Sequence, residues 1–134
     1  MENLSEAKRW LERAKSVMLK VKAAERVEGV MYEDLCLDLF HVSERALVAY
    51  FLYLNQGIPP VRSLEGMLDL LASRGFALPD WLSDVVKLDQ YGFVRREELL
   101  KRSVNRMEYI VMRELSEMLL EWVEGELAQH NIGQ

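Results

Sequence analysis

The sequence predicts an all-α fold, an up-and-down bundle of four to five helices with a long C-terminal helix. Half of the residues are hydrophobic, and the chain has only seven glycines and three prolines, so few residues oppose helix formation. Apolar residues recur in steps of three and four along most of the chain, which is the spacing of one helix face. A chain of 134 residues fits one domain, and we expect a single helical bundle over residues 1–134.

The first expected helix begins at Asn3 and ends before Gly29. Asn3 followed by Glu6 has the form of a capping box, in which the Asn side chain accepts from an early helical N–H and the Glu side chain reaches back. The charged residues fall away from one stripe, so this helix is expected to be buried on one side. The stripe consists of Leu4, Ala7, Leu11, Ala14, Met18 and Val21.

The second expected helix, residues 32–56, is apolar on two sides. The first strip has an ordinary core pattern and consists of Tyr32, Leu35, Leu39, Val42, Ala46, Tyr50 and Tyr53. The opposite strip consists of Leu37, His41, Glu44, Val48, Phe51 and Leu52. Such a helix must be covered on both sides. Two explanations stay open: a central position in the bundle, or a homodimer interface formed by Leu37, His41, Val48, Phe51 and Leu52.

A turn and two short helices are expected next. Gly57 suits the left-handed position after a helix end, and Pro59 and Pro60 prevent the helix from continuing. Ser63 is expected to cap a third helix that ends at Gly75. A fourth short helix should begin near residues 79–80, stop near residue 92, and turn inward its apolar residues Trp81, Leu82, Val85, Val86 and Leu88.

The last expected helix runs from residue 94 to about residue 129. Its predicted buried side consists of Leu100, Val104, Met107, Val111, Leu115, Met118 and Trp122. Four arginines fall close together on the opposite side of this helix, because they are separated by seven, four and seven residues. They are Arg95, Arg102, Arg106 and Arg113.

Charge and cysteine content narrow the class of protein. A net charge of −5 and a pI near 5.1 argue against a protein that coats nucleic acid or binds membrane surfaces in general. A local basic patch remains compatible with this net charge. Cys36 is the single cysteine, so there is no disulfide framework and no multi-cysteine metal site. No apolar run reaches the roughly 18 residues of a membrane span. We expect a cytoplasmic protein without contact to a membrane.

The residues around the second helix resemble the signature of the HEPN family. That signature usually has two Gln, two small residues and then Glu-Lys-Ala-Leu-Lys-Ala, and here the corresponding run is Phe40-His41-Val42-Ser43-Glu44-Arg45-Ala46-Leu47-Val48-Ala49. The likeness continues through Gly57, the two prolines and Leu64 to Leu71, where Arg62 or Ser63 replaces the family's His. It continues further through Leu88-Asp89-Gln90-Tyr91 and Arg95, with Arg96 in place of a Tyr.

The resemblance implies a helical bundle that dimerises and works beside a minimal nucleotidyltransferase, as a nucleotide-binding module or an RNA-cleaving toxin. The RNA-cleaving branch uses an Arg followed four to six residues later by a His, which moves a proton while the Arg binds phosphate. Neither His41 nor His130 follows an Arg at that distance. We therefore predict no catalytic residue.

Two groups of residues are candidates for ligand binding. His41, Glu44 and Arg45 share a turn of the second helix and are suited to hold a phosphate at a dimer interface; a polar edge with pairs inside the helix is the alternative. The second group comes from the arginine line, with Arg95, Arg102 and Arg106 suited to bind phosphates of a nucleotide or RNA. An ordinary solvated face is the alternative there.

Other chemistries find little support in the sequence. There is no Gly-rich phosphate loop, no His or Cys cluster with zinc spacing and no carboxylate–His repeat, so we expect no metal and no cofactor. The sequence thus predicts a non-catalytic, HEPN-like homodimer that binds a nucleotide or a nucleotidyltransferase partner. The alternatives are an RNA-cleaving toxin with a degenerate site and a structural helical interaction protein.

Overall fold

The computed structural model describes the backbone of residues 2–132 and the side chains of residues 3–129. This part of the chain contains seven helical segments and no strand. The segments are α1 (Glu2–Ala24), α2 (Tyr32–Tyr53), α3 (Leu64–Ser73), the 3-10 helix η1 (Asp80–Leu88), α4 (Asp89–Gly92), α5 (Arg96–Leu99) and α6 (Arg106–Ile132). The predicted all-α bundle with a long C-terminal helix is confirmed.

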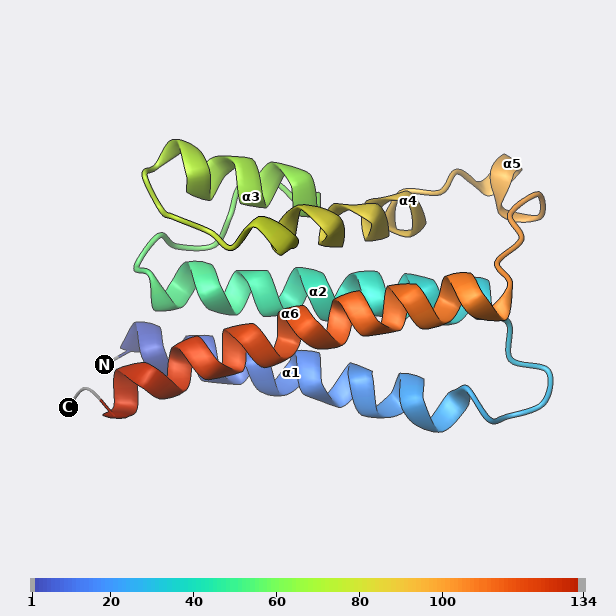
Figure 1. The fold of residues 1–134 in the computed structure, drawn as a ribbon, viewed down its shortest axis with the longest axis horizontal. Coiled ribbons are helices and arrows are strands. Elements are labelled where there is room, and N and C mark those ends of the chain that lie inside the picture. The colour runs from blue at the N-terminus through green and yellow to red at the C-terminus, as the bar shows by residue number, and fades with distance from the viewer. Residues whose placement is uncertain (1, 133–134) are drawn as a thin grey trace.

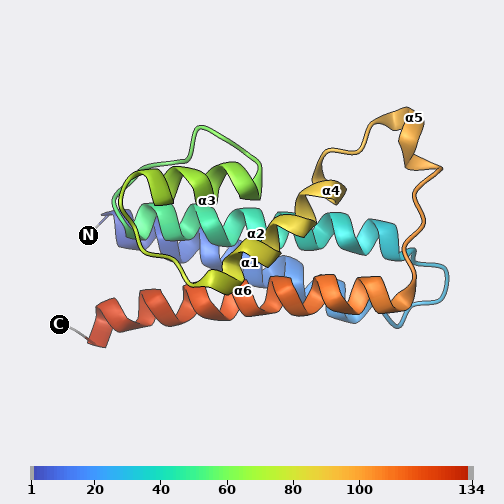
Figure 2. The same cartoon turned by 45° about the horizontal axis from the view of Figure 1, so that its top comes forward.

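The helix α2 occupies the centre of this bundle. Figure 1 shows α1, α2 and α6 running alongside one another, with α3 and the η1–α4 segment beside α2. The view in Figure 2 places α3 and η1 over the same helix, and α2 has contacts with α1, α3, η1, α4 and α6. This position explains why the sequence of α2 is apolar on two sides.

The second apolar strip of α2 is covered by the chain itself. Val48, Phe51 and Leu52 are 6%, 0% and 4% exposed in the single chain, so they belong to its core. These three residues therefore do not form the predicted interface. The other explanation, a central position of α2 in the bundle, accounts for their apolar character. Leu37 is 38% exposed, and the His41 side chain is 33% exposed.

Small residues let α2 and α6 approach closely at their crossing. Ser43 and Ser116 are both buried, and their Oγ atoms lie 3.0 Å apart. The Ser116 hydroxyl also donates to the carbonyl of Leu39 at 3.2 Å. The two hydroxyls are therefore satisfied inside the core, as buried polar groups must be.

The turn between α2 and α3 has the predicted chemistry. Gly57 has a φ of +75°, the left-handed conformation that glycine adopts without strain. The Ser63 side chain accepts from the N–H of Gly66 at 3.0 Å and caps α3, as predicted. The Asp89 carboxylate accepts from the N–H groups of Leu64 and Glu65 at 2.7 and 3.0 Å, so the start of α3 is tied to α4.

The predicted starts of the first and last helices are wrong. Because α1 is already helical at Glu2, Asn3 is not its cap, and the Asn3 side chain instead donates to Asn55 at 2.6 Å. The last helix begins at Arg106 rather than residue 94. Asn105 caps it, since its side-chain oxygen accepts from the N–H of Glu108 at 2.8 Å.

The predicted buried side of the last helix is wrong in part: Val104 is buried and Leu115 and Trp122 are partly buried, but the other four members are exposed. Leu100 is 97% exposed and lies outside α6, while Met107, Val111 and Met118 are exposed on it. The buried side is the neighbouring one, formed by Tyr109, Met112, Ser116, Leu119, Leu120, Val123 and Leu127. Both sides repeat at helical spacing, so periodicity did not distinguish them. Within the described part of the chain, no helix has the length and apolar character needed to cross a membrane.

Candidate functional site

The predicted arginine line does not exist as one surface. It assumed a continuous helix from residue 94, but Arg95 and Arg102 lie in the segment before α6, and only Arg106 and Arg113 are on that helix. Arg102 donates to the side-chain and backbone oxygens of Gln90 at 3.1 and 2.8 Å, and its guanidinium lies 5.5 Å from the centre of the Tyr91 ring. Arg102 therefore holds the chain after α4 in place.

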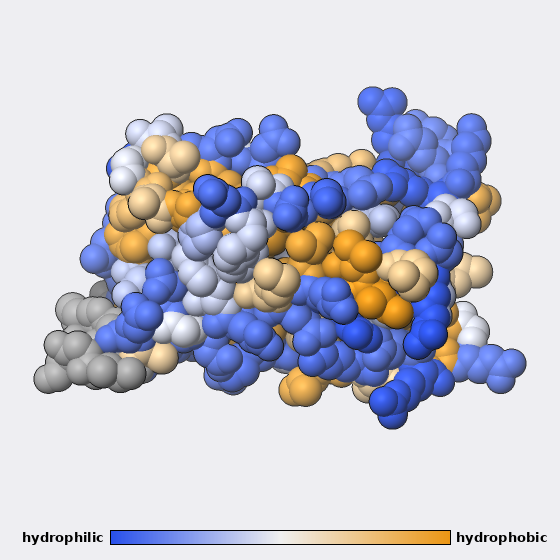
Figure 3. All heavy atoms as spheres, in the orientation of Figure 1, coloured by the Kyte–Doolittle hydropathy of each residue, from blue (hydrophilic) through white to orange (hydrophobic). Residues whose placement is uncertain are grey.

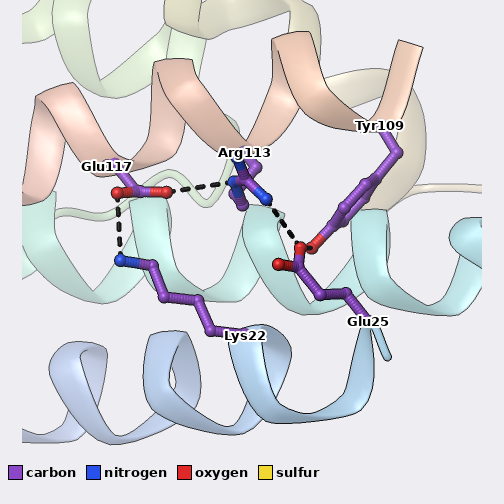
Figure 4. A network of polar contacts seen from close by, with 5 residues as sticks. All are labelled: Lys22, Glu25, Tyr109, Arg113 and Glu117. Atoms are coloured by element: carbon purple, nitrogen blue, oxygen red, sulfur yellow. Dashed lines mark hydrogen bonds and ion pairs between the residues drawn. The ribbon is translucent and has the colours of Figure 1, made fainter. Parts of the chain in front are cut away.

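Arg113 belongs to a polar network between α6 and the end of α1 (Figure 4). Its Nη1 donates to Glu25 Oε2 at 2.7 Å, and the Tyr109 hydroxyl donates to the same oxygen at 2.6 Å. On the other side Arg113 Nε lies 3.1 Å from Glu117 Oε1, in an ion pair without hydrogen-bond alignment. Lys22 extends the network to Glu117 at 3.0 Å. The positive charge of Arg113 is thus neutralised inside the protein.

The pKa values of this network follow from its contacts. Burial by itself raises the pKa of the Glu25 carboxyl, but hydrogen bonds from Tyr109 and Arg113 and the charge of Arg113 outweigh burial and lower the pKa below its ordinary 4.5. Burial, followed by the bond to Glu25, raises the pKa of Tyr109. The network joins two helices, and the Arg113 side chain is not available to bind a ligand.

A different group of arginines lines a pocket between α1 and α2. Arg9 and Arg13 stand one turn apart on α1, with Trp10 beside them, and Arg45 comes from α2; these four residues line a cavity of about 250 Å³. Among the residues whose side chains are described, no ion pair involves these three arginines. We call this cavity the arginine pocket.

A second cavity, of about 320 Å³, adjoins the arginine pocket and shares Trp10 and Arg45 with it. We call it the hinge pocket, because residues of the turn between α2 and α3 form part of its wall. Its lining is mainly apolar and consists of Trp10, Glu44, Arg45, Val48, Ile58, Pro59, Val61, Arg62 and Met67.

The carboxylate of Glu44 is already occupied at the edge of the hinge pocket. Its Oε2 accepts from Arg62 Nε at 3.1 Å, and its Oε1 lies 3.5 Å from His41 Nδ1. The predicted trio of His41, Glu44 and Arg45 is thus brought together, but its members differ in role. Arg45 lines both pockets, Glu44 lines the hinge pocket, and His41 contacts Glu44.

The sequence reasoning missed Arg9, Trp10 and Arg13 as site residues. Two arginines four residues apart were a usable signal, since they face the same side of a helix. What the spacing did not give is the partner helix, because the antiparallel register of α1 and α2 decides that Arg45 joins them. The remaining predicted arginines, Arg95 and Arg106, are exposed and do not line the arginine pocket.

An apolar surface lies elsewhere on the molecule. Figure 3 shows apolar atoms near the middle of the face along which α6 runs, surrounded by hydrophilic residues. The exposed apolar side chains of α6 are Met107, Val111 and Met118. The interface predicted on α2 retains only Leu37 and His41 as partly exposed members.

The described residues offer little for acid–base or nucleophilic chemistry near the arginine pocket. The lining of that pocket contains no histidine, cysteine or carboxylate among them. Cys36 is buried, and burial raises the pKa of its thiol to about 12, which keeps it protonated and unreactive at neutral pH. Over the same residues there is no group of three or more His, Cys, Asp or Glu side chains that could hold a metal ion. The arrangement is suited to bind an anion.

Comparisons with known proteins found no matching family model, no matching curated protein and no matching solved structure. They leave the HEPN resemblance as a prediction from the residues quoted above.

Proposed function

We propose that this chain is a non-catalytic, HEPN-like helical domain that binds a nucleotide through Arg9, Arg13 and Arg45. The observation that carries the proposal is the arginine pocket, in which three arginines from two helices line one cavity and form no ion pair with a described acid. Arginine is suited to phosphate because its planar N–H groups bind two oxygens at once.

The electrostatics of the free protein support this proposal. Three like charges around one cavity repel one another, and that repulsion is relieved when an anion enters. The chain has 22 acidic and 17 basic residues, so acidic partners for these arginines are plentiful in its composition. An arginine cluster that stays unpaired on such a chain favours a ligand role over a solvated face. The half-buried ring of Trp10 adds a flat apolar wall.

The other functions that the resemblance implies remain proposals. Homodimerisation and a nucleotidyltransferase partner rest on the HEPN-like residues alone. Binding to RNA, or its cleavage, would require phosphates to reach the same three arginines, so it becomes an outcome of the test below.

The test is the affinity of the whole chain for each common ribonucleoside triphosphate, measured by calorimetry at low ionic strength. Replacing Arg9 and Arg45 by Ala should weaken binding at least about a hundredfold, since each lost charge-assisted hydrogen bond contributes about 1.5–3 kcal/mol. The matched control replaces Arg95 and Arg106 by Ala, which removes the same charge from exposed positions outside the pocket. It should change affinity less than threefold.

Negligible affinity of the unmodified chain for all four nucleotides would refute the proposal. Equal losses in the two double variants would also refute it, because the effect would then come from net charge alone. Incubation of the same preparations with RNA should leave the RNA intact, and cleavage would favour the toxin alternative.

A further inference from the structure

We propose that the ligand is a nucleoside triphosphate whose phosphates occupy the arginine pocket and whose base occupies the hinge pocket. This inference rests on the proposed nucleotide binding and adds the orientation and the part of the ligand that each cavity recognises. The two cavities adjoin and share Trp10 and Arg45. Their volumes, about 250 and 320 Å³, together suit a small molecule, since such sites usually measure roughly 300–1,000 Å³.

The two cavities differ in chemistry as the two ends of a nucleotide differ. The arginine pocket is lined by three arginines and one tryptophan. The hinge pocket is walled by Val48, Ile58, Pro59, Val61 and Met67 in addition to the residues it shares. A phosphate chain suits the first lining and a flat, largely apolar base suits the second. Trp10, which borders both, is placed to contact the base where it meets the charged end.

The charge of the arginine pocket favours a chain of phosphates over a single phosphate. Arg9 and Arg13 are one helical turn apart, about 5–6 Å between Cβ atoms, and Arg45 approaches from the facing helix. Three cations arranged in this way match several adjacent anionic groups. One monophosphate would leave part of the positive charge uncompensated.

The hinge pocket has a firm frame and exposed apolar walls. Its loop is fixed at the start of α3 by Ser63 and by the two hydrogen bonds to Asp89. Ile58 and Val61 in this loop are nevertheless 57% and 38% exposed. A base bound between them and Trp10 would cover apolar surface that otherwise faces water.

The ion pair between Arg62 and Glu44 provides polar groups at the edge of the hinge pocket. Arg62 uses Nε for Glu44, and no hydrogen bond within the described residues uses its Nη1 or Nη2. These two nitrogens remain as donors toward a carbonyl or ring nitrogen of a base. The cavity therefore offers hydrogen bonding as well as apolar contact.

The experiment compares the tightest-binding ribonucleoside triphosphate with inorganic triphosphate on the whole chain. A double variant, Ile58→Ser with Val61→Ser, should weaken nucleotide binding about tenfold and leave inorganic triphosphate within twofold, because it removes only apolar wall. A second double variant, Arg9→Ala with Arg13→Ala, should weaken both ligands. The matched control is Leu19→Ser with Val27→Ser, two exposed apolar residues outside both pockets, which should change neither affinity.

The outcomes distinguish failure of this inference from failure of the proposed function. If the unmodified chain binds inorganic triphosphate as tightly as the nucleotide, or if the Ile58 and Val61 variant binds the nucleotide normally, the base is not in the hinge pocket and the inference is overturned. Nucleotide binding that still depends on Arg9 and Arg13 would then leave the proposed function standing. If no nucleotide binds, both fail. Circular dichroism of each variant verifies that the helices are intact.

Discussion

Arg113 and the arginine pocket show two opposite fates of positive charge in one small protein. Arg113 is held between Glu25 and Glu117 and joins α6 to the end of α1. Arg9, Arg13 and Arg45 line one cavity and make no ion pair with a described side chain. The comparison teaches that an arginine's role depends on the acids that the fold brings to it. Spacing along the sequence is a weaker guide.

The two kinds of arginine should differ most in their effect on stability. Arg113→Ala should lower the free energy of unfolding by about 2 kcal/mol, because it removes a hydrogen bond between charged groups and leaves Glu25 without its cation. Arg9→Ala is the matched control and should stay within about 0.5 kcal/mol, as is usual for a surface substitution. Urea unfolding of both variants measures the difference. A loss as large for Arg9→Ala as for Arg113→Ala would erase the distinction.

A smaller effect is expected on the pH dependence of stability. The pKa of Glu25 is lowered in the folded protein, so the stabilisation by its network is present above the ordinary value of 4.5 and is lost as pH falls through the folded pKa. Glu25→Gln removes this titration and should lose less stability than the unmodified chain between neutral pH and acid. Urea unfolding at a series of pH values gives both curves. Parallel curves would contradict the assignment.

The sequence predicted the interior of this fold better than its ends. It predicted that both apolar strips of α2 are covered, as well as the Gly57 turn and the Ser63 cap, because each depends on residues that are close in the chain. The start of α6 was missed although Asn105 and Glu108 have the spacing of a capping box. That pattern was applied to Asn3 and Glu6 instead, where the helix begins earlier.

The side of α6 that is buried depended on tertiary packing. Val111 and Met112 are adjacent in sequence and lie on neighbouring apolar sides, yet only Met112 is buried. The buried side includes Ser116, a small polar residue that hydropathy discounts but that fits against Ser43. Tertiary packing also explains why only part of the candidate site could be predicted from the sequence. Arg45 lies on α2 beside His41 and Glu44, whereas its neighbours on α1 follow from how the two helices pack.

The central claim is that a nucleotide binds beside Trp10, and the indole N–H signals of the protein test it directly. The chain has three tryptophans, and Trp81 and Trp122 lie together in a different cluster, with ring centres 6.3 Å apart. Titration of the whole chain with the tightest-binding nucleoside triphosphate, followed by nitrogen–proton correlation spectroscopy, should shift the Trp10 indole signal, identified by its loss in Trp10→Phe. The signals of Trp81 and Trp122 should stay in place. A shift of those two signals with Trp10 unmoved would contradict the account.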